Sequence, residues 1–295
     1  MASLRPNSSS VALRRDARSS ASIVVIAIAL AGCSINLGSM TLPSDQGAPA
    51  VASSNNIASL TDAVKKDPKD PQTYNIRGSV LAQAGRPADA LADFNKAIGL
   101  DPNYGQAYVN RGLVYRRTKK LDLAMADYQR AISLDPNDAQ AYVGRGLVYK
   151  AQKQPEQALA DFNKAIALAP DDAEAYYNRG LLYQADKQHQ FAIDDFTAAH
   201  HLLPQQVQPL LARALSYLAL NEAKKAAADL DEAVQADPQN AQAWVTRGLA
   251  YERLGDKVKA AGSYGQAIDL RPNDQIARAG FARVGGKPGQ TYDTF

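Results

Sequence analysis

Arginine and aspartate recur in this chain at fixed spacings that would let them pair. One arginine returns every 34 residues, at Arg77, Arg111, Arg145, Arg179, Arg213 and Arg247. An aspartate lies 16 residues after one arginine and 18 before the next, at Asp93, Asp127, Asp161, Asp195 and Asp229. A guanidinium and a carboxylate pair strongly, so the pattern favours a ladder of ion pairs, within repeats or between them. The alternative is that the arginines bind acidic ligands.

Residues suited to catalysis are few. The chain has three histidines, His189, His200 and His201, and we expect them at a turn and at the end of a helix, where imidazole needs no special role. The sequence has no glycine-rich phosphate loop, no nucleophile elbow and no zinc-ligand spacing. It therefore predicts no catalytic residue, no metal site and no cofactor, and a protein that is not an enzyme.

The elements that position these side chains follow the same period. Prolines recur at Pro68, Pro102, Pro136, Pro170, Pro204, Pro238 and Pro272, again 34 residues apart. Two helices per repeat explain the pattern, because small residues such as Gly78 and Ala90 let the helix axes approach while Tyr74 and Phe94 fill the space beside them. Each proline then stops the second helix of its repeat.

These positions resemble the tetratricopeptide repeat. In the third copy the matching residues are Tyr142, Gly146, Tyr149, Ala158, Phe162, Ala165 and Pro170. The resemblance implies an all-α fold, a right-handed superhelical solenoid of six helix-turn-helix copies over 71–274. We expect a half-repeat helix over 56–70, a capping helix over 275–284 and a flexible tail over 285–295. The fifth copy has Leu210, Ala214 and Leu230 at the signature positions, so looser packing is expected there.

In this family the first helices line a groove that takes a partner's peptide or helix. The resemblance places ten candidate residues on that surface, and they divide into a polar, mainly cationic half and an apolar half. The first half comprises Asn110, Arg116, Arg117, Lys150 and Asn178, and the second Tyr177, Leu181, Leu211, Leu215 and Leu218. The alternative is that the leucines only pack helices together and the cations are merely solvated. The lysines of the family's carboxylate clamp are absent, so binding of a chaperone tail is not expected.

Cys33 is the only cysteine, and it ends an apolar run that is shorter than a membrane span. Leu30, Ala31, Gly32 and Cys33 resemble the lipobox of bacterial lipoproteins, which implies a signal peptide over 1–32 and a diacylglycerol on the Cys33 thiol. The alternative is an ordinary buried cysteine. Residues 33–55 are rich in Ser, Gly, Pro and Asn and are expected to form a flexible tether.

The charge of the chain bears on its partners. The net charge of +3 comes from residues 1–32, after which 29 basic and 29 acidic residues balance, so a nucleic-acid partner is not expected. The sequence predicts a non-catalytic, lipid-anchored scaffold or adaptor that binds a periplasmic or envelope protein. Its predicted location is the cell envelope, at the outer membrane and facing the periplasm. The alternative is a pilotin-like or barrel-assembly-like factor for an outer-membrane complex. The sequence leaves open whether the protein forms a homodimer.

Overall fold

The computed structural model describes residues 54–292. The predicted signal peptide, Cys33 and all but the end of the predicted tether lie outside these residues. The described part contains fourteen helices and no strand, so the fold is an all-α solenoid, as the sequence predicts. The helices are α3 (Ser54–Lys66), α4 (Pro71–Gln83), α5 (Pro87–Leu100), α6 (Gly105–Arg117), α7 (Leu121–Leu134), α8 (Ala139–Ala151), α9 (Pro155–Leu168), α10 (Ala173–Ala185), α11 (His189–Leu202), α12 (Val207–Ala219), α13 (Ala223–Ala236), α14 (Ala241–Leu254), α15 (Lys257–Leu270) and α16 (Gln275–Arg283).

Helix ends follow from the residues at each boundary. Asp70, Asp138 and Asp172 cap the N-termini of first helices, where each carboxylate accepts hydrogen bonds from backbone N–H groups of the first turn. The turn inside each helix pair contains a residue with positive φ, supplied by glycine at Gly85 and Gly255 and by other residues at Lys119, Lys153, Lys187 and Asn221. Such a residue ends a helix in the left-handed conformation and turns the chain back on itself.

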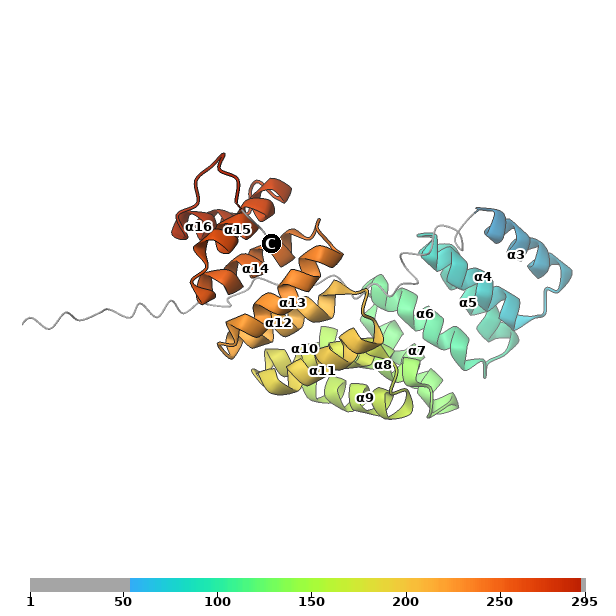
Figure 1. The fold of residues 1–295 in the computed structure, drawn as a ribbon. Helices are drawn as coiled ribbons and strands as arrows, with labels where there is room; N and C mark the ends of the chain where they lie inside the picture. Colours follow the sequence, from blue (N-terminus) through green and yellow to red (C-terminus); the bar gives the residue numbers. More distant parts are fainter. Residues whose placement is uncertain (1–53, 293–295) are drawn as a thin grey trace, which may run out of the picture. The chain divides into compact units, whose positions relative to one another are not determined.

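Successive helices pack as a chain of neighbours (Figure 1). The two helices of each repeat contact each other along their length, and the second helix then packs against the first helix of the next repeat. First helices also contact one another directly, as α4 does α6 and α6 does α8. A Cβ at Gly78 would lie 2.8 Å from the Phe94 ring, so the glycine is what allows the ring to seat between α4 and α5.

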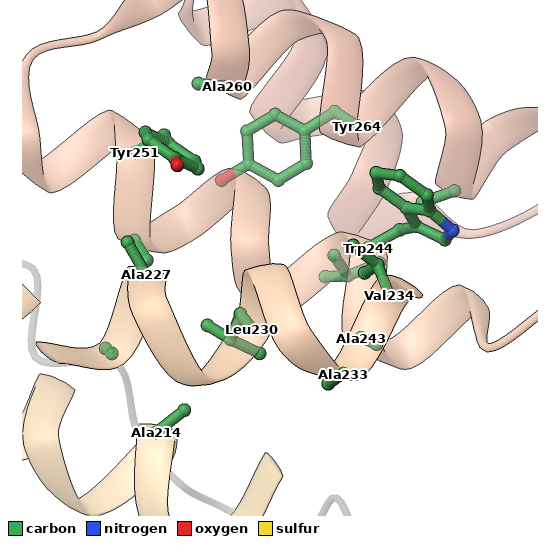
Figure 2. Close-up of a cluster of buried hydrophobic side chains, with 14 of the residues drawn as sticks. Ala214, Ala227, Leu230, Ala233, Val234, Ala243, Trp244, Tyr251, Ala260 and Tyr264 are labelled. Carbon is green, nitrogen blue, oxygen red and sulfur yellow. The ribbon is translucent and has the colours of Figure 1, made fainter. Parts of the chain in front are cut away.

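The fifth repeat is only partly looser than its neighbours. Helices α12 and α13 have fewer close backbone contacts than the other pairs, as expected. The side chains nevertheless pack fully, because Leu210, Ala214 and Leu230 are buried in the cluster that also holds Trp244 and Tyr264. Figure 2 shows Leu230 and Tyr264 within this cluster. The smaller side chains of the fifth repeat therefore share one continuous core with the large rings of the sixth.

The segment before residue 293 contacts the last helix. Where the sequence predicts a free tail over 285–295, the structure places the Tyr292 ring edge-on against Phe281 of α16, with ring centroids 5.8 Å apart. The Tyr292 hydroxyl also accepts a hydrogen bond from the backbone N–H of Lys287 at 2.6 Å. The ring contact places Tyr292 against the capping helix, while the hydrogen bond lies within the segment that follows this helix.

None of the helices between residues 54 and 292 is long and apolar enough to cross a membrane.

Candidate partner-binding face

The ion pairs of the arginine ladder lie between the two helices of a repeat in the first five repeats. In the first five repeats the Nε and Nη2 atoms of the arginine donate to both carboxylate oxygens of the aspartate 16 residues later, over 2.6 to 2.8 Å. The aspartates are buried and the arginines mostly so. This two-point bonding raises the pKa of guanidinia such as Arg145. Of the two pairings left open by the sequence, the first five repeats have the ion pair within a repeat.

The ladder also joins successive repeats. Arg111 Nη1 donates to Asn95 Oδ1 at 2.6 Å and Arg179 Nη1 to Asn163 Oδ1 at 2.7 Å, and in both cases the acceptor lies on the second helix of the preceding repeat. The same arginines lie over aromatic rings of their own helix, as Arg111 does over Tyr108 and Tyr115. These groups are occupied in holding repeats together, which supports the structural interpretation of the ladder.

A second set of polar contacts links the first helices to one another. Asn110 Nδ2 donates to Asn75 Oδ1 at 2.9 Å, Lys150 Nζ to Asn178 Oδ1 at 2.8 Å, and Gln184 Nε2 to Ser216 Oγ at 2.8 Å. Each bond joins the first helices of neighbouring repeats. We call the side of the first helices that carries these bonds the inner face. The bonds place Asn75, Asn110, Lys150, Asn178 and Gln184 on it, and the charge interactions with Lys150 and Glu174 add Arg116, Arg117 and Glu174. We assign Leu181 and Leu215 to the same face from their positions along the first helices.

The polar candidates from the sequence are on this face, but their surroundings are not purely cationic. Arg116 of α6, Lys150 of α8 and Glu174 of α10 interact electrostatically across three repeats. Glu174 was missed from the sequence because an acidic residue in the first turn of a helix is explained by the helix dipole alone. Its spacing from Lys150, one repeat apart on facing first helices, is the signal that could have found it.

Burial shifts the pKa values of Lys150 and Glu174. Loss of solvent lowers the pKa of Lys150 to about 8, against the opposing effect of Glu174, and Arg116 lowers it further. Burial likewise raises the pKa of the Glu174 carboxyl, while Arg116, Arg117 and Lys150 act to lower it. The inner face therefore holds charges at a location where water screens them weakly.

The predicted apolar half is smaller than expected. The prediction of an exposed patch is wrong for Tyr177, Leu211 and Leu218, which are 2%, 6% and 3% exposed. Tyr177 packs on Phe196, with ring centroids 5.8 Å apart, and the two leucines belong to the core between repeats five and six. Position along a helix gives the direction of a side chain but not how deeply its neighbours cover it. Leu181 and Leu215 are half-buried and remain on the inner face.

The histidines lie apart from the inner face. His200 of α11 lies 3.3 Å from Glu232 of α13, between Nε2 and Oε1, on second helices. Within residues 54–292, no group of three or more His, Cys, Asp or Glu side chains is arranged to hold a metal ion.

Comparisons with known proteins agree with this architecture. Models described as tetratricopeptide repeat or TPR repeat match residues 57–105, 112–153, 139–172, 162–193 and 211–275. No curated protein sequence matches the chain.

Solved structures share the fold at low sequence identity. The APC/C hetero-tetramer Cut9–Hcn1 has a TM-score of 0.66 at 18% identity; the match covers 81% of this chain but only 48% of that one, about half its length. YrrB, a TPR protein with an unusual peptide-binding site, has a TM-score of 0.56 at 24% identity, covering 63% of this chain and 96% of YrrB. PilW, a widely conserved type IV pilus biogenesis factor, has a TM-score of 0.64 at 18% identity, covering 71% of this chain and 97% of PilW.

Proposed function

The chain belongs to the tetratricopeptide repeat family of protein-interaction modules, and on that premise we propose that it is a non-catalytic scaffold that holds a partner segment on its inner face. The partner is a protein of the bacterial envelope. Lipid on Cys33 keeps the scaffold on a membrane, proposed as the periplasmic side of the outer membrane.

The observation that carries this proposal is the contrast between two sets of charges. The ladder arginines are paired within the array, whereas no ion pair among residues 54–292 joins Glu174 to Arg116 or to Lys150. Buried charges in proteins are ordinarily paired, because an unpaired one costs solvation energy that nothing returns. Arg116 and Glu174 interact only through their charges and form no ion pair with each other, so this surface is suited to a partner.

The apolar part of the same face supports this assignment. Leu181 of α10 and Leu215 of α12 lie half-buried one repeat apart, next to the polar groups of Asn178 and Gln184. An interface combines a small apolar contact with polar groups that fix its direction. A partner segment with aliphatic side chains at one end and acidic ones at the other fits this order.

A lipid anchor on Cys33 would allow the scaffold to recruit its partner even with modest affinity. The Ser-, Gly- and Pro-rich residues after Cys33 would act as a flexible tether, so the scaffold and a membrane-bound partner would meet at a raised effective concentration. Replacing Cys33 by alanine should release the protein from the membrane fraction without changing its fold. Retention of the C33A protein in membranes after a high-salt wash would count against the lipid anchor.

The inner face is tested with the full-length lipidated protein cross-linked in envelopes. Changing Leu181 and Leu215 together to aspartate should abolish capture of one partner. The matched control changes Leu123 and Phe191, exposed on second helices, to aspartate and should keep that partner. Equal capture by both double variants, each shown to be folded by its unfolding midpoint, would remove the inner face from recognition.

Assembly of an outer-membrane complex is a second candidate, favoured by the likeness to PilW over 97% of that chain. A strain that lacks this protein distinguishes the assembly role from the adaptor role. Loss of a secretin or a barrel protein from the outer membrane would favour the assembly role, and altered cell shape or cell-wall composition would favour the adaptor.

A further inference from the structure

Tyr128, an aromatic residue of a second helix, interacts with a residue of the inner face. Second helices carry Phe94, Phe162 and Phe196 at the position where the second repeat has Tyr128. The Tyr128 ring is buried, and a Cβ at Gly144 of α8 would lie 2.3 Å from it. The other repeats have larger residues in place of Gly144, such as Asn110 and Asn178. The absence of a side chain at Gly144 therefore leaves the gap that this ring fills.

The Tyr128 hydroxyl meets Arg116 through this gap. Burial raises the pKa of Tyr128 to about 12, and the Arg116 guanidinium opposes the rise by its charge and by hydrogen bonding to the phenol oxygen. The Arg116 Nε atom is buried and has no hydrogen-bond partner. Arg116 thus interacts with Tyr128 and keeps its Nε–H donor unused.

The last repeat contains the same arrangement with its partner in place. Tyr264 also has a glycine across the repeat boundary, Gly280, whose Cβ would lie 2.4 Å from the ring. The Tyr264 hydroxyl donates to Glu252 Oε2 at 2.8 Å, and Glu252 occupies the position of Arg116 in its own repeat. Arg283 Nη2 of α16 donates to the same oxygen at 2.8 Å. Here the Glu252 carboxylate, which is hydrogen-bonded to a tyrosine, also forms an ion pair with an arginine of the next helix.

The second repeat lacks that incoming charge. Arg283 lies 31 residues after Glu252, and the residue 31 positions after Arg116 is Leu147, which cannot pair with a guanidinium. Lys150 lies nearby and bonds only to Asn178 among the ion-pair and hydrogen-bond partners found in residues 54–292. The Glu174 carboxyl of α10 acts on Arg116 through its charge, but no ion pair within residues 54–292 joins the two, so Arg116 can still bond a carboxylate from a partner.

We propose that Arg116 binds a carboxylate of the partner segment and that Tyr128, reaching through the gap at Gly144, is the residue that positions it. This inference rests on the proposed function and names the chemistry of its ligand. Arg116 and Lys150 together carry more positive charge than the single Glu174 carboxylate balances, so a second carboxylate is electrostatically favoured. The carboxylate is either an acidic side chain or the end of a chain.

The probes are three peptides that differ only in carboxylate: acetyl-Ala-Leu-Glu-Leu-Ala-amide, the same peptide with Gln for Glu, and the Gln peptide with a free C-terminus. Binding to the full-length protein is followed by NMR, using inner-face backbone amides and the Arg116 Nε–H. We expect a saturable shift with one or both carboxylate peptides, and binding at least about tenfold weaker with the neutral amide. Preference for the Glu peptide assigns a side chain, and preference for the free C-terminus assigns a chain end.

Two variants test the roles of the residues. Arg116→Gln should remove the preference for a carboxylate. Tyr128→Phe retains the ring found in other repeats and should reduce that preference about three- to tenfold with little change in stability. A purely structural tyrosine would leave the ratio of carboxylate to neutral affinities unchanged, and that result would overturn the positioning role.

The outcomes also separate this inference from the proposed function. Equal binding of charged and neutral peptides on the inner face would overturn carboxylate recognition while leaving peptide binding intact. Absence of binding by all three peptides would overturn the carboxylate site, and the cross-linking of the Leu181 and Leu215 variants would then decide the proposed function independently.

Discussion

Arg247 Nε donates to Asp231 Oδ1 at 2.6 Å, across the boundary between the fifth and sixth repeats. In the first five repeats the carboxylate is on the second helix of the arginine's own repeat, but there Arg247 meets Ser263, whose hydroxyl accepts from Nη1 at 2.7 Å. The Tyr251 hydroxyl donates to Asp231 Oδ2 at 2.8 Å. In the sixth repeat, therefore, the ion pair joins two repeats instead of lying within one, and Arg247 is only 1% exposed.

Removing a ladder arginine should destabilise the array. Arg145→Leu leaves the buried Asp161 carboxylate without its ion pair, and breaking a buried pair by removing one partner costs about 3–5 kcal/mol. The free energy of unfolding in urea measures this loss. Arg86, in an exposed pair with Asp89, is the control, and Arg86→Leu should change stability by less than about 1 kcal/mol. Unchanged stability of Arg145→Leu with lost partner binding would instead make the arginines ligand-binding groups.

Adding a methyl group at Gly144 should be tolerated only if the tyrosine is changed with it. Gly144→Ala places a Cβ against the Tyr128 ring and should cost about 1–3 kcal/mol by overpacking. The double variant with Tyr128→Phe should recover part of this loss, because Phe94 coexists with Asn110 one repeat earlier.

Gly105→Ala is the matched control for that cycle, because a Cβ at Gly105 meets nothing within 4 Å. A Gly144→Ala protein as stable as this control, by urea unfolding, would contradict the close fit between Tyr128 and Gly144.

Lys150 should reduce stability near neutral pH. Its pKa falls from 10.5 in the unfolded chain to about 8 in the fold, so between these values the unfolded state binds more protons and stability rises with pH. Lys150→Met removes this dependence. The variant should be more stable than the parent at pH 7, with the difference shrinking as the pH approaches 10.5, as measured by urea unfolding from pH 7 to 10.

The groups facing Lys150 set the size of that effect. Glu174 of α10 favours its charged form, Arg116 of α6 opposes it, and Asn178 accepts its hydrogen bond. Lys164→Met, on the exposed surface of α9, is the control and should show no such trend. A Lys150→Met protein that is less stable than the parent at pH 7 would show that pairing with Glu174 outweighs burial.

The sequence predicted the elements better than the surface. The period of 34 placed the helix pairs, since glycine opposite an aromatic ring and proline after a helix have direct geometric consequences. It could not tell that Tyr177 is buried whereas Leu215 is half-buried, because the depth of a side chain depends on neighbours one repeat away. It also did not reveal Arg247 as an exception, although the absence of an aspartate 16 residues later was readable.

The two tyrosine–glycine pairs have a consequence for how such a chain can change its length during evolution. Side-chain hydrogen bonds such as that from Asn110 to Asn75 reach only one repeat away, so duplication or loss of a whole 34-residue unit would leave most junctions intact. The junctions at Tyr128–Gly144 and Tyr264–Gly280 are different, since each ring fits only a following unit that has the matching glycine. Unequal recombination should therefore be accepted at the remaining junctions and selected against at these two.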